Sequence, residues 1–247
     1  MRDRADKIAA WLADYLKTSV AERYVVGISG GVDSALAAKL AVMGCGRDAV
    51  YGLILPCHSS REDKAAAAQV VEWLQIDYRE IRLTLVQDEF VRLGIIQYEN
   101  TDSVNKAYGN LKSRLRMCAL YLYANANNGL VLGTSNRSEL EIGYFTKYGD
   151  GGVDVEPLAN LPKTDVWEMA QLLDMPEKIV GRPPTAGLWA GQTDENELGM
   201  TYQELDLILR ELPAERSYPE LAKEFRKVNN MRYYNKHKLA APIQCPY

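Results

Sequence analysis

The chain has 247 residues, of which 47% are hydrophobic and 25% are charged, and this composition excludes disordered and fibrous proteins. A net charge of −4 lacks the basic excess of most nucleic-acid binders, so we expect no nucleic-acid partner. No apolar run reaches membrane-spanning length and the first residues lack a secretory signal core, so we expect a cytoplasmic protein without a membrane partner.

Cysteine and histidine usage narrows the chemistry further. The four cysteines form no CxxC pair and predict reduced thiols, not a disulfide framework or a zinc site. The only two histidines, His58 and His237, all but exclude a multi-histidine metal centre. The chemistry is therefore expected to rest on carboxylates, lysines, arginines, hydroxyls and backbone amides.

Apolar periodicity in the first half of the chain predicts helices that alternate with short buried strands. The expected helices are Asp6–Leu16, Asp33–Met43, Ser60–Gln75, Val86–Gln97 and Asn110–Asn125. The expected strands are Tyr24–Ile28, Val50–Leu55, Tyr78–Leu83 and Leu130–Gly133. This alternation predicts an α/β fold with a doubly wound parallel sheet, flanked by helices and joined by right-handed crossovers.

The second half is predicted to be helical and rich in loops. Tyr148–Val155 is rich in Gly and Asp, and Gly181–Gly199, with two prolines and four glycines, predicts a long functional loop. Further helices are expected at Asp165–Leu173, Tyr202–Leu212 and Pro219–Tyr233, before an irregular tail at Lys236–Tyr247. Because no repeat or linker is visible, residues 1–247 are expected to form one domain with a helical C-terminal part.

A glycine-rich motif lies where the first predicted strand meets a helix, the edge at which doubly wound sheets bind ligands. Adjacent glycines let backbone N–H groups crowd around an anion, and serine hydroxyls add donors. Asp33 would be repelled by phosphate and is suited to hold a Mg²⁺ ion that bridges phosphate oxygens. The motif therefore predicts a pyrophosphate cradle made of Gly27, Ile28, Ser29, Gly30, Gly31, Val32, Asp33 and Ser34.

Two other phosphate motifs are excluded by their spacing. A Walker loop requires a lysine after its glycines, and a dinucleotide fingerprint requires Gly-x-Gly-x-x-Gly; the chain has neither here. A tight glycine turn whose Asp and Ser merely cap the helix is the remaining structural alternative. The full Ser-Gly-Gly-Val-Asp-Ser run after a buried strand favours the phosphate site.

The SGGVDS run resembles the pyrophosphate loop of the N-type ATP pyrophosphatases. That superfamily includes NAD synthetase, GMP synthetase, argininosuccinate synthetase and several tRNA-modifying enzymes. The resemblance implies an adenine nucleotide alpha hydrolase-like fold, with ATP as co-substrate. It also implies cleavage between the α and β phosphates and transfer of AMP to a substrate oxygen.

Segments spread from Gly27 to Lys238 resemble the ammonia-dependent NAD synthetases in particular. Asn110–Met117 resembles the family's NxxxRxRM helix, which implies that Arg114 binds substrate. Gly133–Glu139 resembles the GTxNxxE segment, which implies that Thr134 contacts ATP and that Glu139 holds metal.

The stretch Gly143–Gly152 is the most family-specific, and the resemblance implies that Lys147 and Asp154 contact deamido-NAD. Lys163 and Thr185 match ATP contacts, and His237 with Lys238 matches a pair that reaches the substrate. The family usually follows that pair with Arg, whereas this chain has Leu239, so no third basic contact is expected there.

Each of these residues also has an ordinary structural interpretation. Arg114 and Arg116 suit the solvated face of a helix, and Glu139 suits a first helical turn. Asp150 and Asp154 suit turns of a Gly-rich loop, while the lysines suit an exposed surface. All the segments that resemble the family occur together in this chain, and in the same order, which favours the functional interpretation.

The implied reaction adenylates the nicotinate carboxylate of deamido-NAD with ATP and amidates it with ammonia, giving NAD, AMP and pyrophosphate. Mg²⁺ on Asp33 and Glu139 and the charge of Lys163 are expected to stabilise the departing pyrophosphate. Asp150 is expected to accept a proton from ammonia. No length remains for a glutaminase domain, so free ammonia is the expected donor unless a separate glutaminase subunit docks.

Family resemblance also implies a homodimer, for which the helix around Tyr121 and Tyr123 offers a candidate interface, although core burial explains both rings equally well. A GMP-synthetase-like amidating module is one alternative function, but it is expected to lack the Gly143–Gly152 segment. A tRNA-modifying enzyme is another, but it is expected to show a basic surface. The sequence leaves open the number of metal ions and whether nicotinate mononucleotide replaces deamido-NAD.

Overall fold

The computed structural model describes residues 1–96, 102–189, 191–212, 221–242 and 244–245. In the first half the elements are α1 (Arg2–Thr18), β1 (Arg23–Gly27), α2 (Val32–Cys45), β2 (Val50–Ile54), α3 (Arg61–Leu74), β3 (Asp77–Glu80), α4 (Thr84–Arg92), α5 (Asp102–Ala126) and β4 (Gly129–Leu132). In the second half they are α6 (Arg137–Ile142), α7 (Lys163–Leu172), α8 (Glu177–Val180), α9 (Asp194–Leu198), α10 (Tyr202–Glu211), α11 (Ala222–Asn235) and a 3₁₀ turn at Lys236–Lys238.

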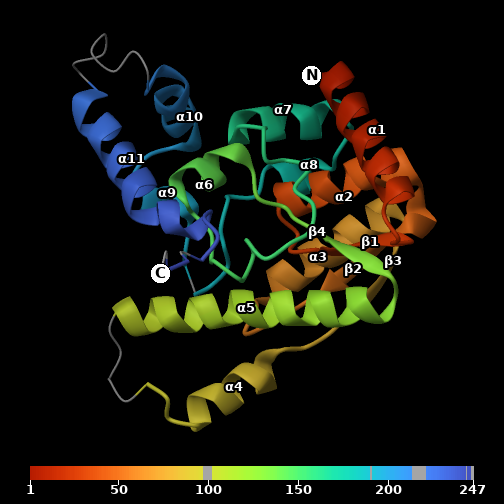
Figure 1. Cartoon of the computed structure of the whole chain (residues 1–247), viewed down its shortest axis with the longest axis horizontal. Helices are drawn as coiled ribbons and strands as arrows, with labels where there is room; N and C mark the ends of the chain where they lie inside the picture. The colour runs from red at the N-terminus through yellow and green to blue at the C-terminus, as the bar shows by residue number, and fades with distance from the viewer. Residues whose placement is uncertain (97–101, 190, 213–220, 243, 246–247) are drawn as a thin grey trace.

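The four strands form one parallel sheet in the order β3-β2-β1-β4, which confirms the predicted α/β class. The chain moves outward from β1 through β2 to β3 and then returns to place β4 on the other side of β1 (Figure 1). The strand order therefore reverses between β1 and β4. Ligands bind outside the carboxyl ends of the strands at such a point, so the fold itself locates the site.

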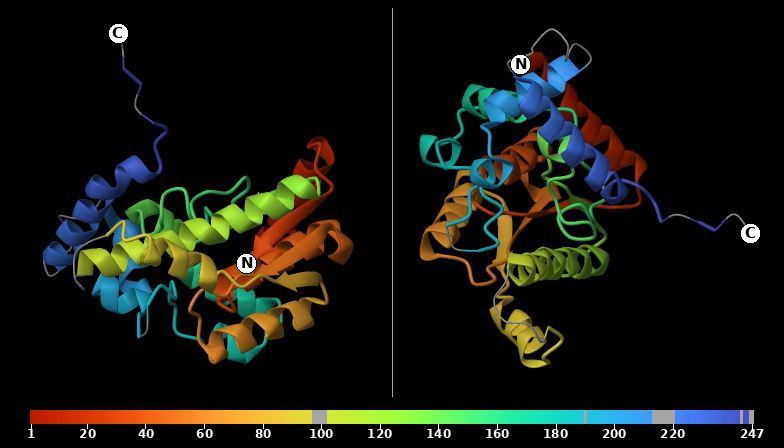
Figure 2. Two further views of the ribbon diagram at one scale, coloured as in Figure 1. Left: turned by 90° about the horizontal axis from the view of Figure 1, so that it is seen from below. Right: turned by 90° about the vertical axis from the view of Figure 1, so that its left-hand side faces the viewer.

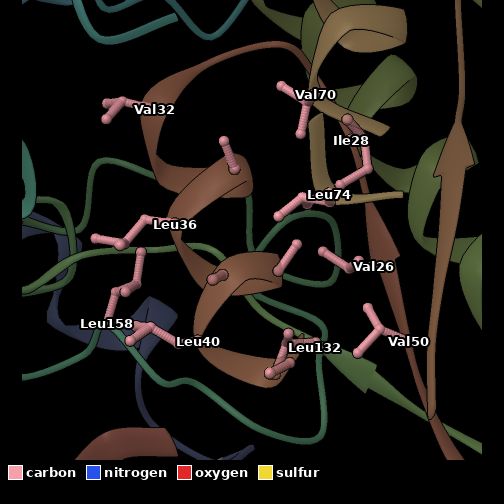
Figure 3. Packing of buried hydrophobic residues seen from close by; sticks show 14 of the residues in the cluster. Val26, Ile28, Val32, Leu36, Leu40, Val50, Val70, Leu74, Leu132 and Leu158 are labelled. Atoms are coloured by element: carbon pink, nitrogen blue, oxygen red, sulfur yellow. The ribbon is translucent and has the colours of Figure 1, made fainter. Parts of the chain in front are cut away.

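Helices cover both faces of the sheet, as two further views show (Figure 2). On one face α2 packs against the strands, with α1 and α7 outside it. Leu36 and Leu40 of α2 are fully buried in the same apolar cluster as Val26 of β1 and Leu132 of β4, and they lie near Leu158 (Figure 3). Burying one such side chain stabilises the fold by roughly 1.5–3 kcal/mol. Helix α2 has apolar residues on all sides, as expected for a helix between the sheet and the outer helices α1 and α7.

The other face is covered by α5, which contacts β1 and β4. Tyr123 of α5 stacks on Tyr51 of β2 with ring centroids 4.5 Å apart. The helix begins at Asp102, well before the predicted start at Asn110. The prediction missed its first turns because they carry few apolar residues at helical spacing. Its Gly109 instead packs closely on Leu188 of the long loop, a tertiary contact that periodicity cannot reveal.

The predicted loop at Gly181–Gly199 is partly wrong, because it contains α9. Thr193 caps this helix by accepting from the Asn196 amide, and Gly199 ends it in the left-handed conformation. Two other short helices, α6 and α8, were likewise not predicted. The ends of two predicted helices, Gln97 and Pro219, lie outside the described residues.

The C-terminal helices α10 and α11 pack with α6 around a second apolar cluster that includes Tyr202, Leu205 and Phe225.

Within the described ranges, no helix combines the length and the apolar character needed to cross a lipid bilayer.

Gly44 sets the distance between α1 and α2. A Cβ added there would lie 2.1 Å from the Ala9 carbonyl oxygen, so Gly44→Ala must push the helices apart. We expect a loss of about 1–3 kcal/mol in unfolding free energy, measured by thermal or denaturant unfolding. Gly181→Ala is the matched control, since its Cβ meets only the Glu177 carbonyl oxygen at 3.2 Å. Equal stability of the two variants would contradict the close-contact account.

Candidate active site

The cradle predicted at Gly27–Ser34 is formed by the turn between β1 and α2. The Ser29 and Ser34 hydroxyl oxygens lie 3.0 Å apart, and the Gly31 amide donates to the Ser29 hydroxyl at 3.2 Å. Ser34 also donates to the Gly31 carbonyl at 3.1 Å. Gly31 is the N-cap of α2 and has no side chain to occupy the helix end, so the first amides of α2 are available to an anion.

Gly30 must be glycine for two independent reasons. Its φ is +85°, a conformation that L side chains rarely adopt. An added Cβ would also lie 2.7 Å from both the Ala66 Cβ and the Ala67 nitrogen of α3. The tight turn is therefore pressed against α3, which fixes its shape.

The end of β4 supplies the second wall of the site. Asn136, fully buried, caps α6 by accepting from the Glu139 amide at 3.1 Å, while its own amide donates to Glu139 Oε2 at 3.2 Å. The Asn136 side-chain Nδ2 also donates to Asp33 Oδ1 at 3.0 Å. One asparagine thus fixes both predicted metal-binding carboxylates across the β1–β4 switch.

Lys163 joins the same two carboxylates. Its Nζ lies 2.5 Å from Asp33 Oδ2 and 3.7 Å from Glu139 Oε1, and the residue is only 1% exposed. Burial alone would lower the pKa of Lys163, but the Asp33 and Glu139 charges outweigh it and raise that pKa. Burial and the Asp33 charge raise the pKa of Glu139, and Lys163 opposes this shift. The cluster therefore places the Lys163 ammonium between two closely spaced acids.

A third acid, Asp194 of α9, completes this centre. It accepts hydrogen bonds from the Tyr144 and Tyr202 hydroxyls at 3.2 and 3.1 Å and from the Ala186 amide at 3.0 Å. The Lys163 ammonium also lies 5.0 Å from the Tyr202 ring centroid. Asp194 thus ties the loop before α9 to the acid–lysine cluster.

Arg182 closes the side of the cradle near α3. Its Nη1 donates to the Gly30 carbonyl at 3.2 Å, and its Nη2 pairs with Asp63 Oδ1 at 2.7 Å. This hydrogen bond orients the Gly30 carbonyl toward the Arg182 guanidinium and so stabilises the turn. A fixed positive charge therefore stands at the rim of the predicted phosphate site.

These groups surround one pocket of about 480 Å³, a volume that suits a nucleotide. Most of the predicted site residues line it: Gly27, Ile28, Ser29, Gly31, Val32, Asp33, Ser34, Thr134, Glu139, Asp150, Lys163, Thr185 and Lys238. Gly30 does not line the pocket but faces α3, where it allows the tight turn. The predicted ATP and metal residues are thus brought together.

Four predicted substrate residues, Arg114, Lys147, Asp154 and His237, lie outside the pocket lining. Arg114 donates to the Lys147 carbonyl at 3.3 Å, and Lys147 Nζ donates to the His237 and Ala240 carbonyls at 2.6 and 2.9 Å. Asp154 accepts from the Val131 amide and the Tyr121 hydroxyl. Three of the four therefore form a neighbouring surface group, and their substrate role stays a prediction.

Three other predicted residues already make contacts within the protein. Asp150 Oδ1 accepts from the Ser113 hydroxyl at 2.6 Å and from the Thr146 amide at 2.9 Å. Thr185 donates its hydroxyl to the Gln192 carbonyl at 2.8 Å. Lys238 Nζ donates to the Gly143 and Phe145 carbonyls at 2.7 and 2.8 Å.

Several site residues were missed by the sequence interpretation. Asn136 had a signal, since an Asn three residues before a Glu is a capping-box pattern. Asp194 and Arg182 lie in the predicted loop Gly181–Gly199 and carried no distinguishing pattern of their own. Arg116 points to the pocket and donates from Nε to the Leu55 carbonyl at 3.2 Å, so the solvated-face interpretation of this arginine is wrong.

The donor set suits Mg²⁺ bound together with nucleotide phosphates. Asp33 and Glu139 offer hard carboxylate oxygens, and the Lys163 ammonium between them shows that this position accepts positive charge. Among the described residues no group of three or more acidic, histidine or cysteine side chains has metal-binding geometry. Mg²⁺ typically uses one or two carboxylates plus substrate phosphates and water, so two are sufficient.

A parallel sheet whose switch point carries a glycine-rich turn, with an acid–lysine cluster beside it, is typical of nucleotide-binding α/β proteins. A family model described as NAD synthase matches residues 4–242, and the chain belongs to this family. This confirms the family predicted from the motifs.

Individual relatives agree. The chain is 44% identical to the NH(3)-dependent NAD(+) synthetase of Thermococcus kodakarensis, over 98% of this chain and 96% of that protein. A solved NMN synthetase from Francisella tularensis superposes with a TM-score of 0.88 at 38% identity, over 100% of this chain and 98% of that one. A solved NH3-dependent NAD synthetase from Campylobacter jejuni gives a TM-score of 0.80 at 27% identity, over 99% and 98% of the two chains.

The geometry of the cradle predicts that neighbouring glycines differ in importance. Gly30→Ala combines a positive φ with the contact to α3, so the turn must shift, and we expect ATP-analogue affinity to fall at least about tenfold. Gly31→Ala meets only the Ser29 hydroxyl at 3.3 Å and is expected to lose less. Isothermal calorimetry of both variants checks this, and unchanged affinity in Gly30→Ala would refute it.

Proposed function

We propose that this chain is an ammonia-dependent ligase that makes NAD from deamido-NAD, ATP and ammonia, with AMP and pyrophosphate as the other products. The observation that carries the proposal is the shared pocket in which the glycine cradle faces the Asp33–Lys163–Glu139 cluster. Family membership and the ammonia-dependent relatives support the same reaction.

Asp33 and Glu139 are proposed to hold Mg²⁺, which supplies positive charge to phosphate oxygens when bound. Lys163 is proposed to add a second positive charge there, since its ammonium already lies between these carboxylates. The amides of Gly30 and Gly31, the hydroxyls of Ser29 and Ser34, and the N-terminus of α2 are proposed to bind the leaving pyrophosphate. Thr134 and Thr185, both in the pocket wall, are proposed as further ATP contacts.

Adenylation requires a carboxylate oxygen of the substrate to attack the α-phosphorus while the bond to the bridging β-phosphate oxygen breaks. The leaving pyrophosphate gains negative charge as that bond breaks. Preorganised N–H donors and a buried cation stabilise such charge without reorganisation at the moment of reaction, which is the largest usual contribution to catalysis.

Amidation requires ammonia to attack the acyl carbon, after which the bond to AMP breaks and the nitrogen loses a proton. Asp150 is proposed as the acceptor, because its carboxylate lines the pocket and is oriented by Ser113 and Thr146. Five residues are proposed to orient the dinucleotide. Arg114, Lys147 and His237 would do so from the neighbouring surface group, Lys238 from the pocket wall and Asp154 from the segment after β4. No side-chain nucleophile is required.

Three further points belong to the proposal. We propose a homodimer, and the exposed Leu122 on α5 next to Tyr121 supports that helix as the contact. The four free cysteines support a reducing, cytoplasmic setting. Residues 1–247 are proposed to act as one catalytic domain that takes free ammonia without a glutaminase subunit. Light scattering that gives a monomeric mass would remove the dimer from the proposal.

Asp33→Asn is expected to lower AMP and NAD formation at least about 100-fold, since it removes a carboxylate from the phosphate site and the close partner of Lys163. Asp48→Asn is the matched control, because Asp48 is exposed in the turn before β2. Near-normal turnover of folded Asp33→Asn protein, checked by circular dichroism, would reject the proposed role.

One assay tests the function itself. The protein is incubated with ATP, Mg²⁺ and ammonium, and deamido-NAD is compared with nicotinate mononucleotide, a second candidate substrate suggested by the similarity to a solved NMN synthetase. Chromatography should show NAD, AMP and pyrophosphate from deamido-NAD. Formation of ADP instead of AMP would overturn the proposal. Faster turnover of nicotinate mononucleotide than of deamido-NAD would identify the mononucleotide as the substrate. Efficient turnover with glutamine alone would overturn the assignment of ammonia as the nitrogen donor.

A further inference from the structure

Outside the pocket, one carboxylate connects the two helices that carry Glu139 and Lys163. Asp206 lies on α10, which packs beside both α6 and α7 (Figure 1). Its Oδ1 accepts from the Ser138 hydroxyl of α6. Its Oδ2 accepts from the Thr164 amide at 2.9 Å and from the Thr164 hydroxyl at 2.8 Å, both on α7.

These bonds cap α7 from outside its own sequence. The N-cap of α7 is Pro162, whose ring offers no capping group. The first two amides of the helix are satisfied instead by other helices, since Lys163 N donates to the buried Ser138 hydroxyl at 2.9 Å and Thr164 N donates to Asp206. A carboxylate at a helix N-terminus also interacts favourably with the helix dipole.

The residues that Asp206 contacts are direct chain neighbours of two site residues. Ser138 directly precedes Glu139, and Thr164 directly follows Lys163, so the same carboxylate holds a chain neighbour of each site residue. The Lys163 ammonium must reach Asp33 at 2.5 Å, and a small shift of either helix would break this contact. Sequence alone gives no sign of this connection, because Asp206 is distant from both helices along the chain.

We propose that Asp206 is a positioning residue that holds Glu139 and Lys163 in register across the phosphate site. The inference rests on the proposed function for the chemistry of those two residues. It predicts a selective defect: groups that bind ATP phosphates and metal are displaced, while the surface group around Arg114 and Lys147 keeps its own contacts.

The test compares Asp206→Ala, Asp206→Asn and Ser138→Ala with Glu204→Ala. Glu204 lies on the same helix but only forms the capping box with Thr201 at the exposed end, so its loss leaves α6 and α7 untouched. We expect Asp206→Ala to raise the KM for ATP and the Mg²⁺ requirement about 10–100-fold, as losses of supporting contacts at metal sites typically do. The KM for deamido-NAD should stay within about twofold.

Asp206→Asn should be intermediate, because its carboxamide oxygen still accepts from Thr164 while its NH₂ group faces Ser138. Ser138→Ala should give a smaller shift in the same direction, and both keep the test informative if Asp206→Ala does not fold. Binding of a non-hydrolysable ATP analogue with Mg²⁺, measured by calorimetry, separates this inference from the proposed function because it needs no turnover. A folded Asp206→Ala protein with wild-type analogue affinity, or one in which all substrates weaken equally, would overturn it.

Discussion

The site is organised around a buried ammonium shared by two carboxylates. Lys163 is almost fully removed from solvent, and taking an isolated charge out of water costs several kcal/mol. Asp33 at 2.5 Å and Glu139 at 3.7 Å offset that cost. The three residues come from α2, α6 and α7, so their charge interactions link these three helices at the pocket. The same contacts that permit this charge in the interior thus assemble the catalytic groups.

The sheet explains why this cluster lies where it does. The strand order reverses between β1 and β4, and the turns after these strands point to the same edge. The first turn forms the cradle around Gly30, and the second leads through Asn136 into α6. Asn136 bridges the two by bonding to Asp33, so the amides proposed to bind phosphate and the carboxylates proposed to bind metal face one pocket. In the proposed reaction, the negative charge of a leaving pyrophosphate would meet fixed hydrogen-bond donors and the Lys163 ammonium together.

Much of this arrangement was predictable from sequence because its signals are local. Alternating apolar runs predicted the parallel sheet, and the spacing of Gly30, Gly31 and Asp33 predicted the cradle. The resemblance of Gly133–Glu139 to a family segment predicted a metal-binding role for Glu139, which lines the pocket, although α6 was not among the predicted helices. The capping pattern of Thr193 and Gly199 was also readable, yet the surrounding glycines and prolines favoured a loop.

What the sequence could not predict depends on contacts between distant segments. In the sequence, Asp194 is an ordinary acid of a predicted loop and Asp206 an ordinary acid of a predicted helix. Only packing brings the first to Tyr144 and Tyr202 and the second to Ser138 and Thr164. The early start of α5 likewise depends on the packing of Gly109 against the loop before α9. The resemblance also did not show that three of the predicted substrate residues, Arg114, Lys147 and His237, lie together outside the pocket.

A structure of the protein with Mg²⁺ and a non-hydrolysable ATP analogue tests the central claim most directly. The account predicts that the β- and γ-phosphates lie against the amides of Gly30 and Gly31, with Mg²⁺ between phosphate oxygens and the carboxylates of Asp33 and Glu139. A triphosphate bound elsewhere, or an adenine ring in the glycine cradle, would contradict it.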